Sequence, residues 1–139
     1  MKQLDNLVRI GKLKAEPPSR VEFEGLVRSG RARLKDARTA GLSVYGQFDL
    51  AYNAAHALAL AALRQRGYRS ENRYLVFQCL EHTLDLPAAS WRVLDRAHNK
   101  RNVAEYSGDT EVEAELLAAL LRVAQDLERR VGELAVPAE

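Results

Sequence analysis

The chain has 139 residues, of which 47% are hydrophobic, 29% charged and 6% aromatic, and its formal net charge is +2. This apolar content excludes a disordered chain, and the single cysteine, Cys79, excludes a disulfide framework. The length predicts one domain over residues 1–139, with a short helix and a proline-containing break in residues 1–18. No segment has the pattern of a targeting signal, and no apolar run approaches the roughly 20 residues that span a bilayer. We therefore expect a cytoplasmic protein with no membrane association and no cofactor.

The first three predicted elements are helices. The first begins near the N-terminus and is closed by Glu16-Pro17-Pro18. Ser19 is placed to cap the second, whose apolar residues recur at helical spacing as far as Gly41. The third runs from about Tyr45 to Arg66, ahead of Gly67, and is alanine-rich and apolar nearly all round, as expected of the central helix of a bundle. The outer face of the second helix is basic, which indicates either a solvated face or a phosphate contact, through Arg28, Arg31, Arg33, Lys35 and Arg38.

Three more helices complete the prediction. Ser70 is expected to cap the fourth, which Asp85-Leu86-Pro87 closes, and the fifth runs from about Ala88 to Tyr106. The last begins with a capping box at Thr110–Glu113. Residues 109–139 hold 8 acidic and 3 basic side chains, so their net charge of −5 leaves +7 on residues 1–108. The pattern is typical of an all-α bundle of five to six helices.

The fifth predicted helix departs from the usual apolar pattern. The residues expected to face inward begin with Trp91 and Leu94. At the next four positions with the same helical spacing, the residues are polar. A buried polar side chain lowers stability unless it finds a partner, and such breaks are expected at functional sites. These four positions therefore mark a candidate site made of His98, Arg101, Asn102 and Glu105.

A second polar stretch lies in the central helix. Asp49, Asn53 and His56 share one face of an otherwise apolar segment, with Tyr52 beside them. The two polar stretches are most simply satisfied if they meet. They then form either an inter-helix hydrogen-bond network without chemistry or a functional groove, completed by a second subunit. His56 and His98 are candidate general bases, because imidazole titrates near neutral pH, whereas no spacing of His, Asp or Glu predicts a metal site.

The segment Arg101-Asn102-Val103-Ala104-Glu105-Tyr106 resembles the motif of HEPN domains, small helical bundles of prokaryotic toxin–antitoxin and defence systems. The segment from Asp49 to Leu58 and the helix end at Leu63–Tyr68 are similar to the preceding helix of that family, so the resemblance covers roughly residues 43–130. It implies a HEPN-like fold, a homodimer, and RNA or a nucleotidyltransferase as partner. In active members of the family, Arg and His from two subunits meet and cleave RNA without metal.

The chain departs from the family motif where the catalytic His should follow. The positions five to seven residues after Arg101 hold Tyr106, Ser107 and Gly108, and a tyrosine with a pKa near 10 is no comparable base at pH 7. The resemblance thus implies a degenerate motif that retains Arg101 and Asn102. Tyr106 is a candidate for the tyrosine that a nucleotidyltransferase partner can adenylylate, although the family's tyrosine aligns with Gly108.

Three functions follow as hypotheses. The first is a HEPN-like toxin–antitoxin or defence component that binds RNA, a nucleotide or a nucleotidyltransferase and does not cleave. The second is a metal-independent ribonuclease that pairs Arg101 with His98 or His56. The third is a non-catalytic dimeric interaction module. The catalytic candidates are Arg101 and His98, and the binding candidates are Asp49, Tyr52, Asn53, His56, Asn102, Glu105 and Tyr106.

Overall fold

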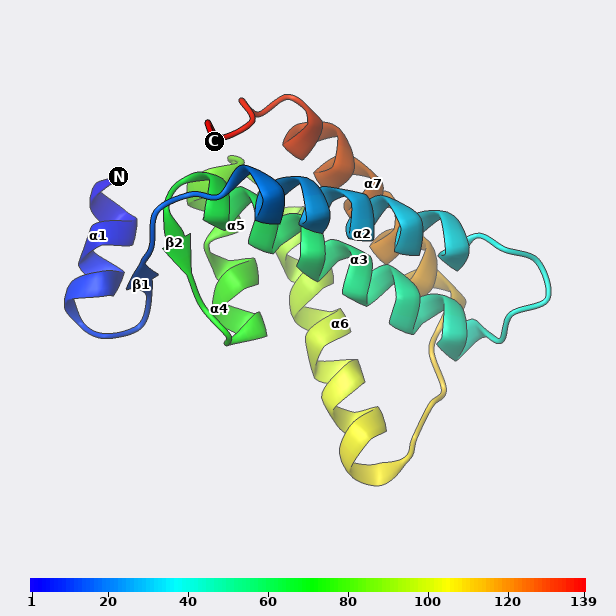
Figure 1. Ribbon diagram of the computed structural model, residues 1–139. Helices are drawn as coiled ribbons and strands as arrows, with labels where there is room; N and C mark the ends of the chain where they lie inside the picture. Colours follow the sequence, from blue (N-terminus) through cyan, green and yellow to red (C-terminus); the bar gives the residue numbers. More distant parts are fainter.

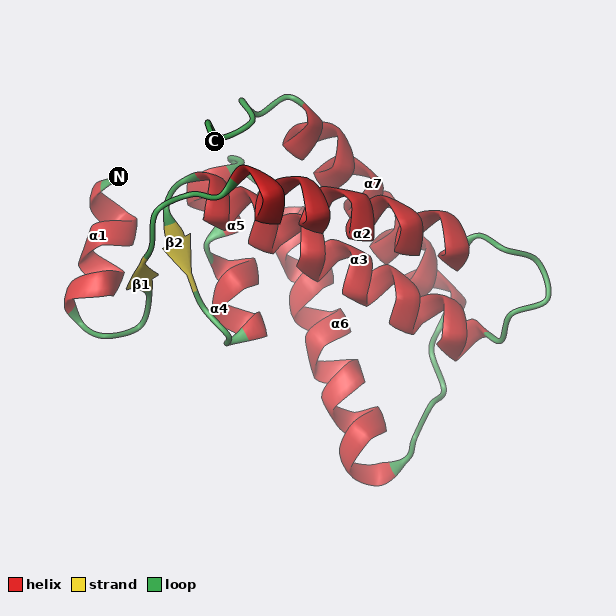
Figure 2. Cartoon of the chain, viewed as in Figure 1, coloured by secondary structure: helices red, strands yellow, loops and turns green.

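The computed structural model describes all residues, 1–139, and is a bundle of helices with one very short antiparallel sheet (Figures 1 and 2). The all-α bundle predicted from the sequence is confirmed. None of the helices is both long and apolar enough to cross a bilayer. The elements in chain order are α1 Lys2–Arg9, β1 Lys14–Ala15, α2 Arg20–Ala37, α3 Val44–Gln65, β2 Tyr68–Arg69, α4 Arg73–Gln78, α5 Leu80–Thr83, α6 Ala88–Ser107 and α7 Ala114–Gly132.

Helix α3 is the centre of the bundle, as its all-round apolar sequence predicts. Helices α2 and α7 pack against it along most of its length, and α4, α5 and α6 contact its other side. Gly30 of α2 lies so close to α3 that a Cβ atom there would come within 2.7 Å of Cγ of Leu58. The alanines of α3 and this glycine therefore allow two helix backbones to approach closely. The fully buried side chains of α3 are Phe48, Ala51, Tyr52, Ala54, Ala55, Leu58, Ala61, Ala62 and Leu63.

The predicted ends of α3 and the start of α2 are confirmed. The Ser19 hydroxyl accepts a hydrogen bond from the Glu22 amide at 3.2 Å, as an N-cap does. Helix α3 ends at Gln65, and Gly67 adopts the left-handed conformation with φ of +90°. Helix α2 stops at Ala37, before the expected Gly41, and α1 stops at Arg9, well before the prolines.

The sheet is absent from the sequence prediction. Lys14–Ala15 pairs with Tyr68–Arg69, so the chain between α1 and α2 is held to the end of α3. Arg64, with only 1% of its surface exposed, fastens the same segment. Its guanidinium donates to the carbonyl oxygens of Glu16 and Pro17 at 2.9 and 2.7 Å and pairs with the Glu22 carboxylate. Two residues per strand give no alternating pattern, which explains why the strands escaped prediction.

The fourth predicted helix is two short helices, because the chain turns at Cys79 between α4 and α5. Its cap is Asn72, whose side chain accepts from the Leu75 amide at 3.0 Å, so the prediction of Ser70 as the cap is wrong. Ser70 accepts from the Asn72 amide instead and shapes the turn that precedes the helix. Cys79 is buried among apolar side chains, and burial raises the pKa of its thiol to about 11.

The predicted capping box of the last helix is also wrong. Helix α7 begins at Ala114, and its N-cap Glu113 makes no side-chain capping bond. The Asp109 carboxylate accepts from the Glu111 amide at 3.1 Å and stabilises a turn where the box would have started the helix. Asp109 also pairs with Lys100 at 3.4 Å. The predicted end of α6 is close to the observed one, with Gly108 in the left-handed conformation.

Candidate functional site

The polar stretches of α3 and α6 meet, as the sequence predicts. The Tyr52 hydroxyl lies 3.0 Å from Nδ1 of His98. One turn further along α6, Nε of Arg101 lies 3.8 Å from the Asp49 carboxylate. Tyr52 is completely buried, so a ligand at the surface could contact the side chains bonded to Tyr52 but not the tyrosine itself.

His98 is occupied at both ring nitrogens. The Asn102 amide Nδ2 lies 3.2 Å from Nε2, and Tyr52 takes Nδ1. With the Asn102 amide in this orientation, Nε2 accepts and the hydrogen of Nδ1 points to the tyrosine oxygen. Burial lowers the pKa of His98, with Arg101 and Arg73 acting in the same direction against Asp95. A neutral imidazole with both nitrogens engaged holds two helices together and has no nitrogen free to move a substrate proton.

Two arginines from different helices lie over the buried tyrosine ring. The guanidinium carbon of Arg101 is 5.0 Å from the centroid of the Tyr52 ring, and that of Arg73 on α4 is 5.7 Å from it. Both distances are within the range of cation–π attraction. Tyr52 thus supports two cations that would otherwise repel each other.

Arg101 keeps hydrogen-bonding capacity. Its Nη2 pairs with the Glu105 carboxylate at 3.0 Å, one helical turn away. Its Nε is buried without a hydrogen-bond partner, because the 3.8 Å contact with Asp49 is too long for one. A guanidinium has five N–H donors in a planar fork that matches phosphate or carboxylate oxygens. Arg101 is therefore only partly satisfied within the chain.

The other two predicted residues of α3 behave differently from each other. The side-chain oxygen Oδ1 of Asn53 accepts from Nη1 of Arg73 at 2.9 Å, so it positions that arginine. His56 packs edge-on against Phe77, and its Nε2 is buried with no partner. Burial, followed by the charges of Arg73 and Arg101, lowers the pKa of His56 to about 4. His56 is thus a neutral side chain beside the cluster and makes no hydrogen bond to His98 or Arg101.

The C-terminal end of α6 is exposed from residue 105 to 107, and Figure 1 shows this end of the helix extending past α3 and α4. Tyr106 is 91% exposed and Val103 46% exposed. Glu105 is exposed too, and it touches the cluster only through its ion pair with Arg101. The predicted binding residues thus divide into a partly buried cluster and an open helix end.

Sequence reasoning missed Arg73 and Tyr74. The Tyr74 ring lies 5.0 Å from that of His98, and its hydroxyl donates to Asp95 at 2.8 Å. Arg73 is four residues from the buried Phe77, so a charged residue on the inward face of a short apolar helix was the signal that could have found it.

The chain matches no protein-family model, and a search of curated proteins likewise gives no match. No three His, Cys, Asp or Glu side chains lie close enough together to hold a metal ion. The basis for a function is therefore the chemistry of the side chains themselves.

Proposed function

We propose that this protein is a HEPN-like domain that binds RNA through its phosphates and does not cleave it, as a component of a toxin–antitoxin or defence system. The observation that carries the proposal is the convergence of Arg73 and Arg101 over the Tyr52 ring. Two guanidiniums near one ring favour an anionic ligand, and the phosphates of nucleic acid are anions that arginine side chains bind with matching geometry.

The charge distribution supports a nucleic-acid ligand. Residues 1–108 carry a formal net charge of +7, although the whole chain carries only +2. Arg73 and Arg101 both lie on this basic part of the chain. With few aromatic side chains exposed for stacking on bases, we expect binding that depends on salt more than on sequence.

The state of His98 favours binding over cleavage. Its nitrogens are engaged by Tyr52 and Asn102 and its pKa is lowered, so it supplies no free base or acid beside Arg101. In the HEPN motif the histidine follows the arginine by five to seven residues. Tyr106 occupies the first of these positions and is exposed at the helix end. Arg101 and Asn102 then act as binding residues of a degenerate motif.

A homodimer is part of the proposal. The apolar side chains of Val103 and Tyr106 on the free end of α6 are exposed, as is Val44 at the start of α3. A second subunit, or a nucleotidyltransferase partner, that covered these side chains would lie next to Arg101 and Glu105. The mass in solution, measured by light scattering, tests the dimer directly.

RNA binding is tested by fluorescence anisotropy with a labelled single-stranded RNA of mixed sequence at several salt concentrations. We expect Arg73→Gln and Arg101→Gln each to weaken binding and to reduce the salt slope by about 0.7, the contribution of one phosphate contact to single-stranded nucleic acid. Arg122→Gln on α7 is the matched control, because Arg122 is exposed and outside the cluster. An equal effect of all three variants, or no binding by the wild type, contradicts the proposal.

Two further experiments distinguish the alternatives. If Arg28→Gln alone weakens binding, the RNA lies on the basic face of α2 and the cluster is structural. If the protein cleaves RNA in the presence of a chelator, and Arg101→Ala or His98→Ala abolishes the cleavage, the protein is the ribonuclease of the second hypothesis. We expect intact RNA on a denaturing gel.

A further inference from the structure

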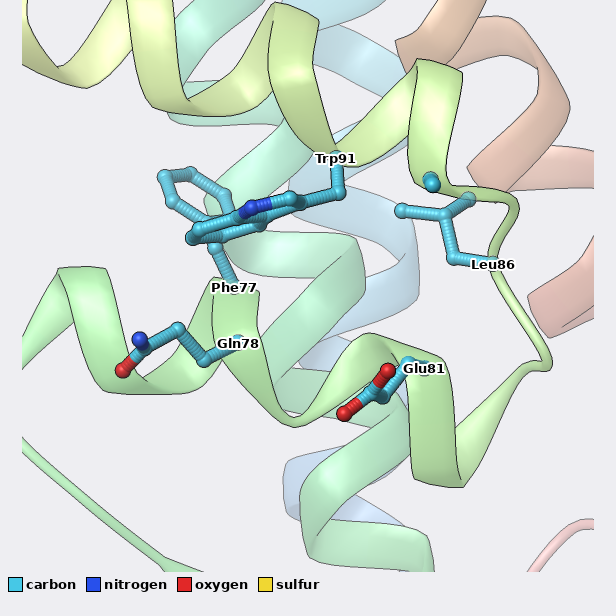
Figure 3. A pocket seen from close by; sticks show the side chains of 6 residues that line it. Phe77, Gln78, Glu81, Leu86 and Trp91 are labelled. Atoms are coloured by element: carbon cyan, nitrogen blue, oxygen red, sulfur yellow. The ribbon is translucent and has the colours of Figure 1, made fainter.

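A small pocket opens between α4–α5 and the first turn of α6, and it shares no lining residue with the arginine cluster. Its volume is about 220 Å³. Drug-sized ligands occupy pockets of about 300–1,000 Å³, so this one has room for a group the size of a single amino-acid side chain. Six residues line it, as Figure 3 shows: Phe77, Gln78, Glu81, Leu86, Ala88 and Trp91.

The walls of the pocket are aromatic and aliphatic. In Figure 3 Trp91 and Phe77 border one side of the opening, and Leu86 borders it further to the right. Phe77 and Leu86 are buried, and Trp91 is half-buried. The Tyr74 ring packs against Trp91 at 5.3 Å between centroids and 67° between planes, which fixes the orientation of the indole. Part of the indole surface is therefore held open toward the pocket.

The charge of the pocket is negative. Glu81 is its only charged lining residue, and its side chain is 68% exposed. In Figure 3 Glu81 projects from α5 on the other side of the pocket from Trp91. Asp85, which directly precedes the lining residue Leu86, is exposed as well. The His82 imidazole lies 3.3 Å from the Glu81 carboxylate and does not line the pocket.

We propose that this pocket binds the side chain of a lysine or arginine from a basic segment of a partner protein. A tryptophan face and a carboxylate on opposite sides of one space attract an organic cation, and tryptophan is the aromatic ring that does so best. The aliphatic stem of the lysine or arginine packs on Leu86, Ala88 and Phe77, as long basic side chains do on apolar surface. The Gln78 amide at the rim is placed to bond the peptide that carries the side chain.

This inference does not depend on RNA binding at the arginine cluster. The two sites prefer ligands of opposite charge, so a single anionic ligand does not serve both. Failure of the RNA experiment leaves the pocket proposal in place, and the reverse also holds.

Trp91 is the only tryptophan of the chain, so its fluorescence reports on the pocket alone. The full-length protein is titrated with a short blocked peptide of glycines around one lysine, and with the same peptide carrying norleucine instead. We expect the lysine peptide to change the fluorescence in a saturable way and to bind at least about threefold more tightly than the norleucine peptide, from the one added ion pair. Equal binding of the two, or no change with either, overturns the proposal.

Glu81→Gln and Glu71→Gln make a matched pair of variants, because each removes one exposed carboxylate and only Glu81 lines the pocket. We expect Glu81→Gln to remove the preference for lysine and Glu71→Gln to keep it. If both variants lose the preference for lysine, the preference arises from net charge, and the proposed site is wrong. Butylammonium serves as the free-amine probe: we expect it to bind more weakly than the lysine peptide, and equal or tighter binding overturns the assignment to a protein partner.

Discussion

The hydroxyl of Tyr52 and Nδ1 of His98 lie 3.0 Å apart, and this contact joins the middle of α3 to the middle of α6. Tyr52 is completely buried and also lies beneath the guanidiniums of Arg73 and Arg101. One tyrosine thus bonds a partly buried imidazole and lies against two cations. The position of the candidate site depends on it.

Tyr52→Phe should therefore destabilise the fold without changing its core packing. The substitution removes one oxygen atom and leaves Nδ1 of the partly buried His98 without its partner, which costs about 1 kcal/mol. Urea unfolding followed by circular dichroism measures the change. Tyr106→Phe is the control, because that hydroxyl is at the exposed end of α6, and its effect should be within about 0.5 kcal/mol of zero. Equal stability of the two variants would show that the Tyr52–His98 contact contributes nothing.

His56 should make the fold less stable in mild acid. Burial and the charges of Arg73 and Arg101 lower its pKa from 6.5 to about 4 in the folded chain. Between these values the unfolded chain binds a proton that the folded chain does not. The contribution of His56 to the free energy of unfolding is therefore complete above pH 6.5. It decreases as the pH falls toward 4, by on the order of 3 kcal/mol.

Urea midpoints at about pH 7.5 and about pH 4.5 test this prediction. His56→Gln should lose most of the wild-type difference between the two pH values, whatever its absolute stability. His98→Gln should lose a part, because the pKa of His98 is lowered as well. If His56→Gln keeps the full difference, His56 is protonated in the folded chain as readily as in water, and its burial has no electrostatic consequence.

Arg64→Met should release the segment that precedes α2. The guanidinium is buried and bonds the carbonyl oxygens of Glu16 and Pro17 and the Glu22 carboxylate, so its loss leaves several polar groups unpaired. We expect a loss of about 3 kcal/mol and faster hydrogen exchange in residues 14–19. Arg66→Met, at an exposed position two residues away, should change neither quantity. Unchanged exchange in Arg64→Met would mean that β1 and β2 hold the segment by themselves.

Two glycines of α2 should respond to alanine with opposite signs. In Gly30→Ala the new methyl group would lie 2.7 Å from Cγ of Leu58, so α2 and α3 must separate, at a cost of about 1–3 kcal/mol. In Gly25→Ala the nearest atom is 3.9 Å away at the end of Arg28, and the helix gains up to about 1 kcal/mol. Thermal unfolding of both variants gives the sign of each change in stability. Stabilisation by both would show that the helices are free to move apart.

Much of the candidate site could be predicted from the sequence. Polar residues at helical spacing in two otherwise apolar helices predicted that Asp49 and Tyr52 would meet His98 and Arg101. Arg73 was missed because its helix is a turn and a half long, so its spacing of four residues from Phe77 was the only sign that it faces inward. HEPN-like dimerisation, RNA binding and the partner protein stay predictions.

The local chemistry of the chain decided the long helices. Apolar spacing, the Ser19 cap and the left-handed glycines after α3 and α6 are short-range features, which a sequence displays directly. Tertiary structure decided everything that depends on residues far apart in the chain. Arg64 finds its partners Glu22, Pro17 and Glu16 at 42 to 48 positions away, and two-residue strands exist only because α3 brings them together. The same holds for His98: whether it is a free base or an engaged one depended on Tyr52, 46 positions earlier, and the contact leaves it engaged.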